Sequence, residues 1–179
     1  MTKWIVDMAH SDVQFKVKHL MINTVTGTFK DFNVNVESNG ADFEGAKVSF
    51  VAKVASITTN NEMRDNHLRS DDFFNAEAYP EMKFESTSMR SASGDKFTLE
   101  GNLTIRETTK PVLLDVEYGG SMVDFYGNHK AGFEATAKIN RKDFGLAWNG
   151  ITEAGGVVVS DEVRITLNVQ LQQVAEVAA

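Results

Sequence analysis

The sequence predicts an all-β fold: a single extended antiparallel barrel of eight strands, with one or two short helices around residues 61–75 and 141–147. Apolar and polar residues alternate with a period of two along most of the chain, which is typical of half-buried strands. Most turns between these segments are short, which favours antiparallel neighbours. The segments reach about ten residues, longer than usual, and eight such strands with one apolar face favour a closed barrel over a sandwich.

The first half of the chain supplies the opening strands in order. Residues Asp12–His19 alternate, with apolar side chains on one face and Asp, Gln and Lys on the other. The alternation returns at Val25–Phe29 and resumes out of phase at Phe32–Val36, so we expect a bulge or a sharp bend between these two segments. The dipeptide Asn39-Gly40 predicts a turn, and Ala46–Val54 forms the next strand with its apolar residues facing inward.

The segment from Asn60 to Asn75 breaks the strand pattern and predicts the first helix. Asn60 or Asn61 is suited to cap its start, while Asp65 and Arg69 have the i, i+4 spacing of a helical ion pair. Ser70 or Asp71 is suited to cap a short turn after the helix. The expected inward residues are Met63, Leu68, Phe73 and Phe74, and the expected solvated residues are Arg64, Asn66 and Arg69.

Alternation returns beyond Pro80 and continues to the end of the chain. Residues 107–110 are predicted to form a turn, with Pro111 opening the next strand, where its missing N–H does the least harm. An irregular excursion runs over residues 141–156. The expected inward residues are Met82, Phe84, Ser86 and Ser88; Phe97, Leu99, Gly101, Leu103 and Ile105; Val112, Leu114, Val116 and Tyr118; Ala131, Phe133, Ala135, Ala137 and Ile139; and Val163, Ile165, Leu167, Val169 and Leu171.

Composition and charge exclude several classes of protein. The 179 residues contain 18 Lys and Arg against 25 Asp and Glu, a net charge of −7, so the chain lacks the basic excess that nucleic-acid binding requires. It has no cysteine, which excludes disulfides and thiolate metal sites. We expect one domain over residues 1–179, no cofactor and no membrane-spanning segment. Because the N-terminus lacks the features of a signal peptide, we expect a cytoplasmic location.

Four histidines and one dense polar cluster are the candidates for catalysis or metal binding. The histidines lack the spacing of a metal site, although His19 shares its parity with the inward residues of its strand. The cluster Arg64–Asp72 is interpreted as a catalytic or metal site built on Asp65, His67 and one of the last two aspartates, as a capped helix in water, or as a helix closing one barrel mouth near a polar head group. We favour the capped helix. The charged segment 141–143 is interpreted as a surface turn anchored by Phe144.

Ten short segments spread over nearly the whole chain make a specific pattern through their order and spacing. They are Trp4–Asp7, His10–Leu20, Gly27–Phe29, Ala55–Thr59, Arg64-Asp65, His67–Phe74, Tyr79-Pro80, Gly101–Ile105, Thr109–Pro111 and Asn140–Leu146. In this arrangement the chain resembles the YceI-like family, often described as polyisoprenoid-binding and lipocalin-like. Glu107 stands where the family usually has a glycine, which concerns the geometry of that turn, and many relatives carry a secretion signal.

The resemblance implies a lipocalin-like barrel whose pore holds the tail of an amphiphilic isoprenoid or similar lipid, with no established catalysis. Burial of an apolar chain in such a pore contributes roughly 25 cal/mol per Å², and a few polar groups at the mouth fix the head. The central members of the inward stripes are the predicted tail contacts: Phe15, Val17, Phe29, Phe50, Phe84, Leu99, Leu103, Val116, Phe133 and Ile165. The predicted rim contacts are His19, Arg64, His67 and Asn149.

The leading hypothesis is therefore a non-enzymatic protein that binds, stores or transports an isoprenoid-type lipid, such as a quinone or a polyprenyl compound. Two alternatives remain open. One is an enzyme that acts on a bound lipid through Asp65 and His67, which requires both groups within reach of one proton. The other is an interaction module with a packed barrel and no ligand. A homodimer formed through the apolar segment Val157-Val158-Val159 is a further hypothesis about partners.

Overall fold

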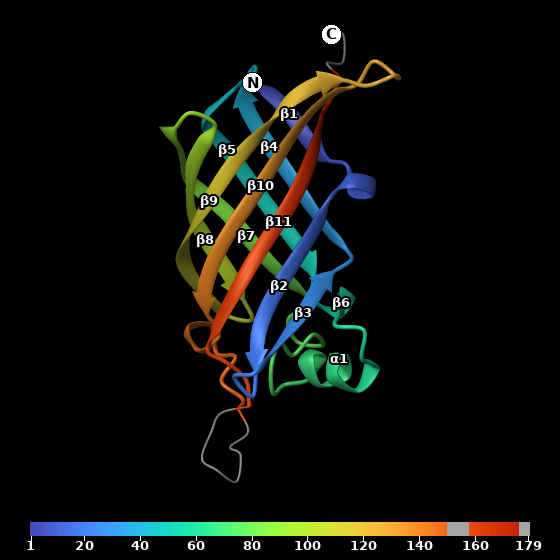
Figure 1. Ribbon diagram of the computed structural model, residues 1–179, viewed down its shortest axis with the longest axis vertical. Helices are drawn as coiled ribbons and strands as arrows, with labels where there is room; N and C mark the ends of the chain where they lie inside the picture. Colours follow the sequence, from blue (N-terminus) through green and yellow to red (C-terminus); the bar gives the residue numbers. More distant parts are fainter. Residues whose placement is uncertain (150–157, 176–179) are drawn as a thin grey trace.

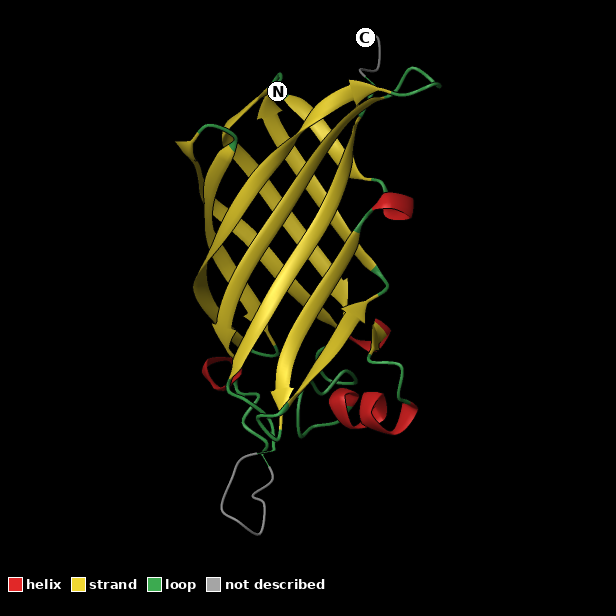
Figure 2. Cartoon of the chain, in the orientation of Figure 1, coloured by secondary structure: helices red, strands yellow, loops and turns green. Residues whose placement is uncertain are grey.

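The computed structural model describes residues 1–149 and 158–175, and within them the chain is almost entirely β-structure. Figure 2 shows strands around a central axis, with the helix beside one end of the barrel. The elements are β1 (Thr2–Val6), η1 (Met8–His10), β2 (Asp12–His19), β3 (Asn23–Phe29), β4 (Phe32–Asn39), β5 (Asp42–Lys53), η2 (Val54–Ser56), β6 (Ile57–Thr58), α1 (Glu62–Arg69), β7 (Glu81–Ser93), β8 (Lys96–Ile105), β9 (Thr108–Val123), β10 (His129–Asn140), η3 (Arg141–Phe144) and β11 (Glu162–Gln173), where η denotes a 3₁₀ turn.

These strands form a closed antiparallel barrel with eight positions around its circumference (Figure 1). Strands β1 and β2 both pair with β11, at Leu171–Gln173 and Arg164–Asn168 respectively, so they share one position that η1 interrupts. Strands β3 and β4 share the next position in the same way. The pairing of β1 with β11 closes the sheet, which removes the exposed edges that an open sheet would leave.

The predicted all-β fold is confirmed, together with the main turns and bends. Strand β2 has the predicted bounds, and the sequence slip marks the bend between Phe29 and Phe32. At the Asn39-Gly40 turn, Gly40 has the left-handed φ of +63° that favours glycine. The predicted helix 61–75 shortens to the eight residues of α1, and the second predicted helix is only the 3₁₀ turn η3.

Two local predictions were wrong. The turn between β8 and β9 contains only Arg106 and Glu107, so Pro111 lies inside β9 rather than at its start. It is tolerated there because the pairing of β9 with β10 ends at Asp115, and Pro111 pairs only with β8. In β7 the ladder shifts register between Ser86 and Ser88, so Met89 is buried at the position predicted for Ser88.

The two ends of the barrel differ in their packing. The end that holds the start of β1 and the end of β11, called here the termini end, is filled by four aromatic side chains: Trp4, Phe43, Tyr118 and Phe133. Trp4 donates from Nε1 to Oγ of buried Ser38 at 2.9 Å, which satisfies the indole within this packing. The opposite end, called the helix end, lies beside α1 and the β2–β3 turn (Figure 1).

Asp7 holds the η1 turn, which separates β1 from β2, against the neighbouring strand β10. Its Oδ2 accepts from Lys130 Nζ at 2.9 Å and lies 3.0 Å from His10 Nδ1, while Oδ1 accepts from the amide of Ala9 at 3.1 Å. The hydrogen bond from Lys130 is the main reason that the pKa of Asp7 lies below its ordinary value, against the opposing effect of burial. A carboxylate with a depressed pKa stabilises the fold above its unfolded pKa of about 4, and this contribution is lost as pH falls through the folded pKa.

We expect Asp7→Asn to reduce the free energy of unfolding by about 1–2 kcal/mol at neutral pH. The loss should shrink below about pH 4, where the wild-type carboxylate is itself being protonated. Urea titrations of both proteins across this pH range measure the difference. A pH-independent difference would show that the charge of Asp7 contributes nothing.

Candidate functional site

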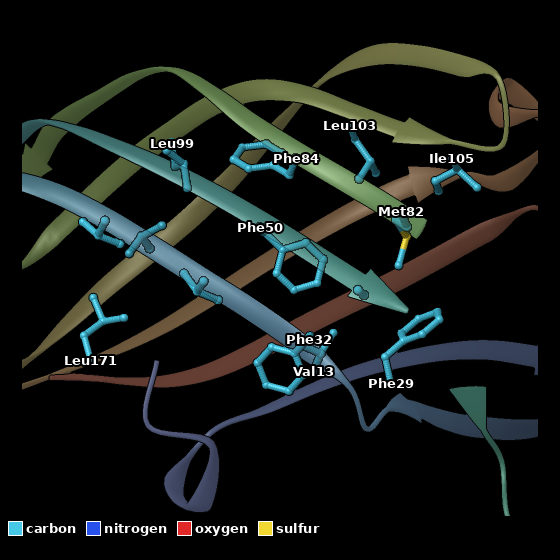
Figure 3. Packing of buried hydrophobic residues seen from close by; sticks show 14 of the residues in the cluster. Val13, Phe29, Phe32, Phe50, Met82, Phe84, Leu99, Leu103, Ile105 and Leu171 are labelled. Atoms are coloured by element: carbon cyan, nitrogen blue, oxygen red, sulfur yellow. The ribbon is translucent and has the colours of Figure 1, made fainter. Parts of the chain in front are cut away.

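The inner face of the barrel encloses an apolar hollow, called here the barrel cavity. It has a volume of about 180 Å³, and within the described part of the chain every lining side chain except Arg141 is apolar, including seven phenylalanines. Figure 3 shows how Phe50, Phe84 and Leu103 extend from neighbouring strands into this interior. Several of the lining residues, among them Phe15 and Phe133, pack against the buried core and are themselves only half-buried.

The barrel cavity is costly to maintain when empty. At about 24 cal/mol per Å³, a dry hollow of this size destabilises a fold by about 4 kcal/mol. It is also larger than the ~150 Å³ engineered cavity that binds benzene. Such a hollow is unfavourable for the packed-barrel alternative, and an apolar guest would recover the lost contacts.

A second hollow, called here the basic cavity, lies at the helix end. Its volume is about 200 Å³, and its apolar lining includes Trp148. The titratable side chains among its described lining residues are all basic: Lys18, His19, Arg64, His67 and Arg141. The two cavities meet where five residues line both of them: Phe15, Phe74, Arg141, Leu146 and Val163. An apolar chamber thus adjoins a chamber of similar volume whose wall combines apolar and basic side chains.

Phe15 is held at this junction by glycine. A Cβ atom at Gly27 on the neighbouring strand would lie 2.1 Å from Cζ of the Phe15 ring, so the ring packs directly on the Gly27 backbone. The Phe15 ring also contacts Phe29, with ring centroids 5.7 Å apart. Gly27 thereby leaves the room in which the Phe15 ring sits between the two cavities.

Helix α1 carries Arg64 and His67 to the basic cavity. Asn61 caps the helix, as expected, by accepting from the amide of Arg64 at 3.1 Å. Arg64 donates from Nε to Thr59 Oγ1 at 2.7 Å and from Nη2 to the Thr59 carbonyl at 2.9 Å. These contacts hold the half-buried guanidinium against the cavity wall rather than in open water, which corrects the expectation of a solvated Arg64.

Other expectations for α1 were also wrong. Asp65 is buried and accepts from the amide and hydroxyl of Thr59, at 2.8 and 2.6 Å, instead of pairing with Arg69. Half-buried Arg69 instead donates to the carbonyls of Ala55 and Ile57. Met63 points outward and is 86% exposed, whereas Leu68 is half-buried as expected. The helix is therefore anchored to the residues before it by buried polar contacts.

Asp65 and His67 do not form the acid–base pair that the enzyme alternative requires. His67 Nε2 lies 2.8 Å from Oδ2 of Asp72, and its ring meets Trp148 edge-on, with centroids 4.7 Å apart. Asp65 is occupied on the other side by Thr59. Their i, i+2 spacing places them on different faces of α1.

Arg141 is the residue that sequence reasoning missed. Its side chain is 3% exposed and donates to four carbonyls, those of Leu146, Trp148, Val159 and Ser160. Burial lowers its pKa, and Asp161, with Oδ1 3.9 Å from Nη2, partly offsets this effect. The expected surface turn is thus wrong for Arg141, although Phe144 is buried as predicted. The period-two stripe of β10 supplied the signal, since Arg141 is the next inward position after Ile139.

The structure gathers most of the predicted site residues. Those lining the barrel cavity are Phe15, Phe29, Phe50, Phe84, Leu99, Leu103, Val116, Phe133 and Ile165. Val17 lines the basic cavity instead, together with His19, Arg64 and His67. Asn149 does not line either cavity. Its Oδ1 accepts from the amides of Val158 and Val159, at 3.0 and 3.1 Å, so it fixes the chain that forms one wall of the basic cavity.

The apolar edge expected at Val157–Val159 does not lie free on the surface. Val158 and Val159 are half-buried, line the basic cavity and bond to Asn149, while Val157 lies outside the described residues. Among the residues described, no cluster of three His, Asp or Glu side chains is arranged to hold a metal ion. No helix in the same residues has the length and apolar character to cross a membrane.

A family model and the sequences of known proteins indicate the same family for this chain. The model of the YceI-like domain matches residues 4–171. A UPF0312 protein of Staphylococcus epidermidis is 39% identical over 165 residues, 92% of this chain and 94% of the relative, and one of Photorhabdus laumondii is 43% identical over 135 residues, 75% of this chain and 70% of the relative.

Solved structures give the same fold. The YCEI protein of Campylobacter jejuni has a TM-score of 0.77 and 37% identity, covering 95% of this chain and 97% of its own. BcnA of Burkholderia cenocepacia has a TM-score of 0.80 and 25% identity, covering 92% and 98%. A polyisoprenoid binding domain from Saccharophagus degradans, with 15% identity and a TM-score of 0.68 over 96% and 98%, shares the fold alone.

Proposed function

Because the chain belongs to the YceI-like domain family, we propose that its barrel binds an amphiphilic isoprenoid-type lipid and stores or carries it without chemical change. The observation that carries this proposal is the apolar barrel cavity joined to the basic cavity at Phe15 and Arg141. The first accepts a tail and the second a head group. The Saccharophagus neighbour, described as polyisoprenoid-binding, has the same fold and is consistent with this class of ligand.

The tail contributes most of the affinity. An isoprenoid chain that leaves water for the barrel cavity gains roughly 25 cal/mol for each Å² of apolar surface that it buries. The cavity wall presents aliphatic and phenyl groups and no described polar atom except those of Arg141, so little of this gain is lost to desolvation of the protein. Aromatic side chains pack the termini end, so the head group should remain at the helix end, beside the basic cavity.

The basic cavity favours an anionic head group, such as a polyprenyl phosphate or diphosphate, over a neutral quinone. Its described titratable lining is basic throughout, in a chain whose net charge is −7. Arg64 is already oriented by Thr59, so little side-chain entropy is lost when it binds an oxyanion. The separation of Asp65 from His67 supports binding without catalysis.

A comparison of two ligands with one tail tests this proposal. Binding of geranylgeranyl diphosphate and geranylgeraniol is followed by the fluorescence of Trp148, which lines the basic cavity, in a Trp4→Phe background. We expect Arg64→Gln to weaken diphosphate binding about tenfold, equivalent to about 1.4 kcal/mol, and to leave alcohol binding nearly unchanged.

Arg69→Gln is the matched control, because Arg69 lies on the same helix and also donates to backbone carbonyls but does not line the basic cavity. It should alter neither affinity. Equal weakening of both ligands by Arg64→Gln would contradict the anionic-head assignment, and failure of wild type to bind either ligand would contradict lipid binding itself.

A further inference from the structure

The turn between β2 and β3 displays three consecutive large apolar side chains at the helix end. Leu20, Met21 and Ile22 are 40%, 59% and 85% exposed. They directly follow Lys18 and His19, which line the basic cavity. Met63 of α1 is 86% exposed at the same end of the barrel (Figure 1). Exposed apolar groups therefore occur at the same end of the barrel as the cavity that we assign to the ligand head.

The backbone of this turn is unfavourable for the residues that it carries. Leu20 and Met21 have φ values of +53° and +58°, and the amide of Ile22 donates to the carbonyl of His19 at 3.2 Å. Two successive left-handed residues in a tight hairpin turn are usually Asn and Gly, because a bulky side chain is strained there. The amide of Leu20 also donates to the Val158 carbonyl at 2.8 Å, so the turn is held firmly with its apolar side chains outward.

The same hairpin is basic in an otherwise acidic chain. No Asp or Glu occurs from Val13 to Lys30, a segment that contains three lysines and His19, although the whole chain carries 25 acidic residues. Lys16 and Lys18 are both exposed on β2, and Lys18 also borders the basic cavity. An apolar tip flanked by lysines combines the two interactions by which proteins bind to anionic membrane surfaces.

We propose that the Leu20–Ile22 turn inserts into the interface of an anionic phospholipid bilayer and places the basic cavity against the membrane surface. The lipid's apolar tail then passes between bilayer and barrel without full exposure to water. The hydrogen bonds of the Leu20 and Ile22 amides are made within the protein, so insertion of the tip does not leave these two groups unpaired.

A second exposed hairpin at the termini end provides a contrast. The β9–β10 turn displays Phe125 and Tyr126, which are 107% and 90% exposed. It also carries Asp124, whose pKa lies below its ordinary value because its carboxylate accepts from the backbone amides of Asn128 and Tyr126. This tip keeps a negative charge that an anionic surface repels, and it lies at the barrel end that aromatic residues fill.

Co-flotation with lipid vesicles tests the proposal. Wild type should bind vesicles of equal parts phosphatidylcholine and phosphatidylglycerol at low salt, and binding should weaken on phosphatidylcholine alone and at about 0.5 M salt. The triple variant Leu20→Asn, Met21→Gly, Ile22→Ser should bind at least about tenfold more weakly. Its melting temperature should hold or rise, because Asn and Gly suit the left-handed turn; retained stability separates membrane binding from folding.

The matched control is Phe125→Ser, Tyr126→Ser, which removes comparable apolar surface from the other hairpin and should leave vesicle binding unchanged. Loss of binding in this control with retention in the triple variant would overturn the proposal. So would the absence of wild-type binding to the anionic vesicles. Ligand retention is measured separately in detergent-free solution, so either hypothesis can fail without the other.

Discussion

Leu103→Trp should abolish lipid retention while leaving the barrel folded. Leu103 lies on β8 with its side chain in the barrel cavity, where an indole would occupy the space required by the tail (Figure 3). Filling an existing hollow costs less than overpacking a tight core, which typically costs about 1–3 kcal/mol. We therefore expect a change of less than about 1 kcal/mol in stability, or roughly 2–4 °C in Tm, and at least about a tenfold loss of extractable lipid or added ligand.

The control for this variant is Leu113→Trp on the paired strand β9. Leu113 is 60% exposed on the outer face of the same hairpin, opposite Glu100. The added bulk there should change neither Tm nor lipid content. A large drop in Tm for Leu103→Trp with unchanged lipid content would indicate a packed interior that is unrelated to ligand binding.

Arg141→Ala should be the most destabilising single substitution that we predict. It removes the donor shared by four carbonyl groups and leaves the acceptors of Leu146 and Trp148 unpaired in a protected site. Loss of a buried, hydrogen-bonded charge costs about 3–5 kcal/mol, so Tm should fall by roughly 10 °C or more. The Tm of Arg141→Lys should lie between those of wild type and Arg141→Ala, because an ammonium group keeps the charge but not the planar set of donors.

Lys142→Ala separates this effect from simple loss of charge. Lys142 lies 3.2 Å from the same Asp161 but is about half exposed, so its removal should cost at most about 1 kcal/mol. Thermal melts of the three variants measure the order of effects. Similar Tm values for Arg141→Ala and Lys142→Ala would contradict the stabilising role assigned to the buried Arg141 guanidinium and its four carbonyl contacts.

The barrel was predictable because the alternation of apolar and polar residues that specifies each strand is local and periodic. The stripe Leu99, Gly101, Leu103 and Ile105 defines the inward face of β8 directly, and the slip between Phe29 and Phe32 marks a bend that the backbone makes. A register shift caused the miss at Ser88, where the irregularity in β7 moves the inward position by one residue. Predicting inward residues from a period of two assumes that strand pairing is regular, so the prediction fails wherever a β-bulge shifts the register.

The polar part of the site was less predictable, because its partners are distant in sequence or compete with helical pairing. Asp65 and Arg69 have the spacing of an ion pair, yet Thr59 and the carbonyls of Ala55 and Ile57 bind them instead. A buried acceptor that lacks a partner costs more than a solvated helical ion pair contributes, so the tertiary contacts prevail. Arg141 lies beside Lys142 and Asp143, and such a run of charges is typical of a surface turn. The period-two alternation of β10, however, places Arg141 on the inward face.

Native mass spectrometry of the purified wild-type protein tests the central claim most directly, with organic extraction of the same sample. The proposed function predicts a fraction of molecules heavier than the bare chain, with an added mass that extraction removes and that matches an unmodified isoprenoid-type lipid with an acidic head group. Leu103→Trp should lack this mass and Leu113→Trp should keep it. A wild-type protein that shows only the bare mass, and that fails to take up added geranylgeranyl diphosphate, would contradict the account.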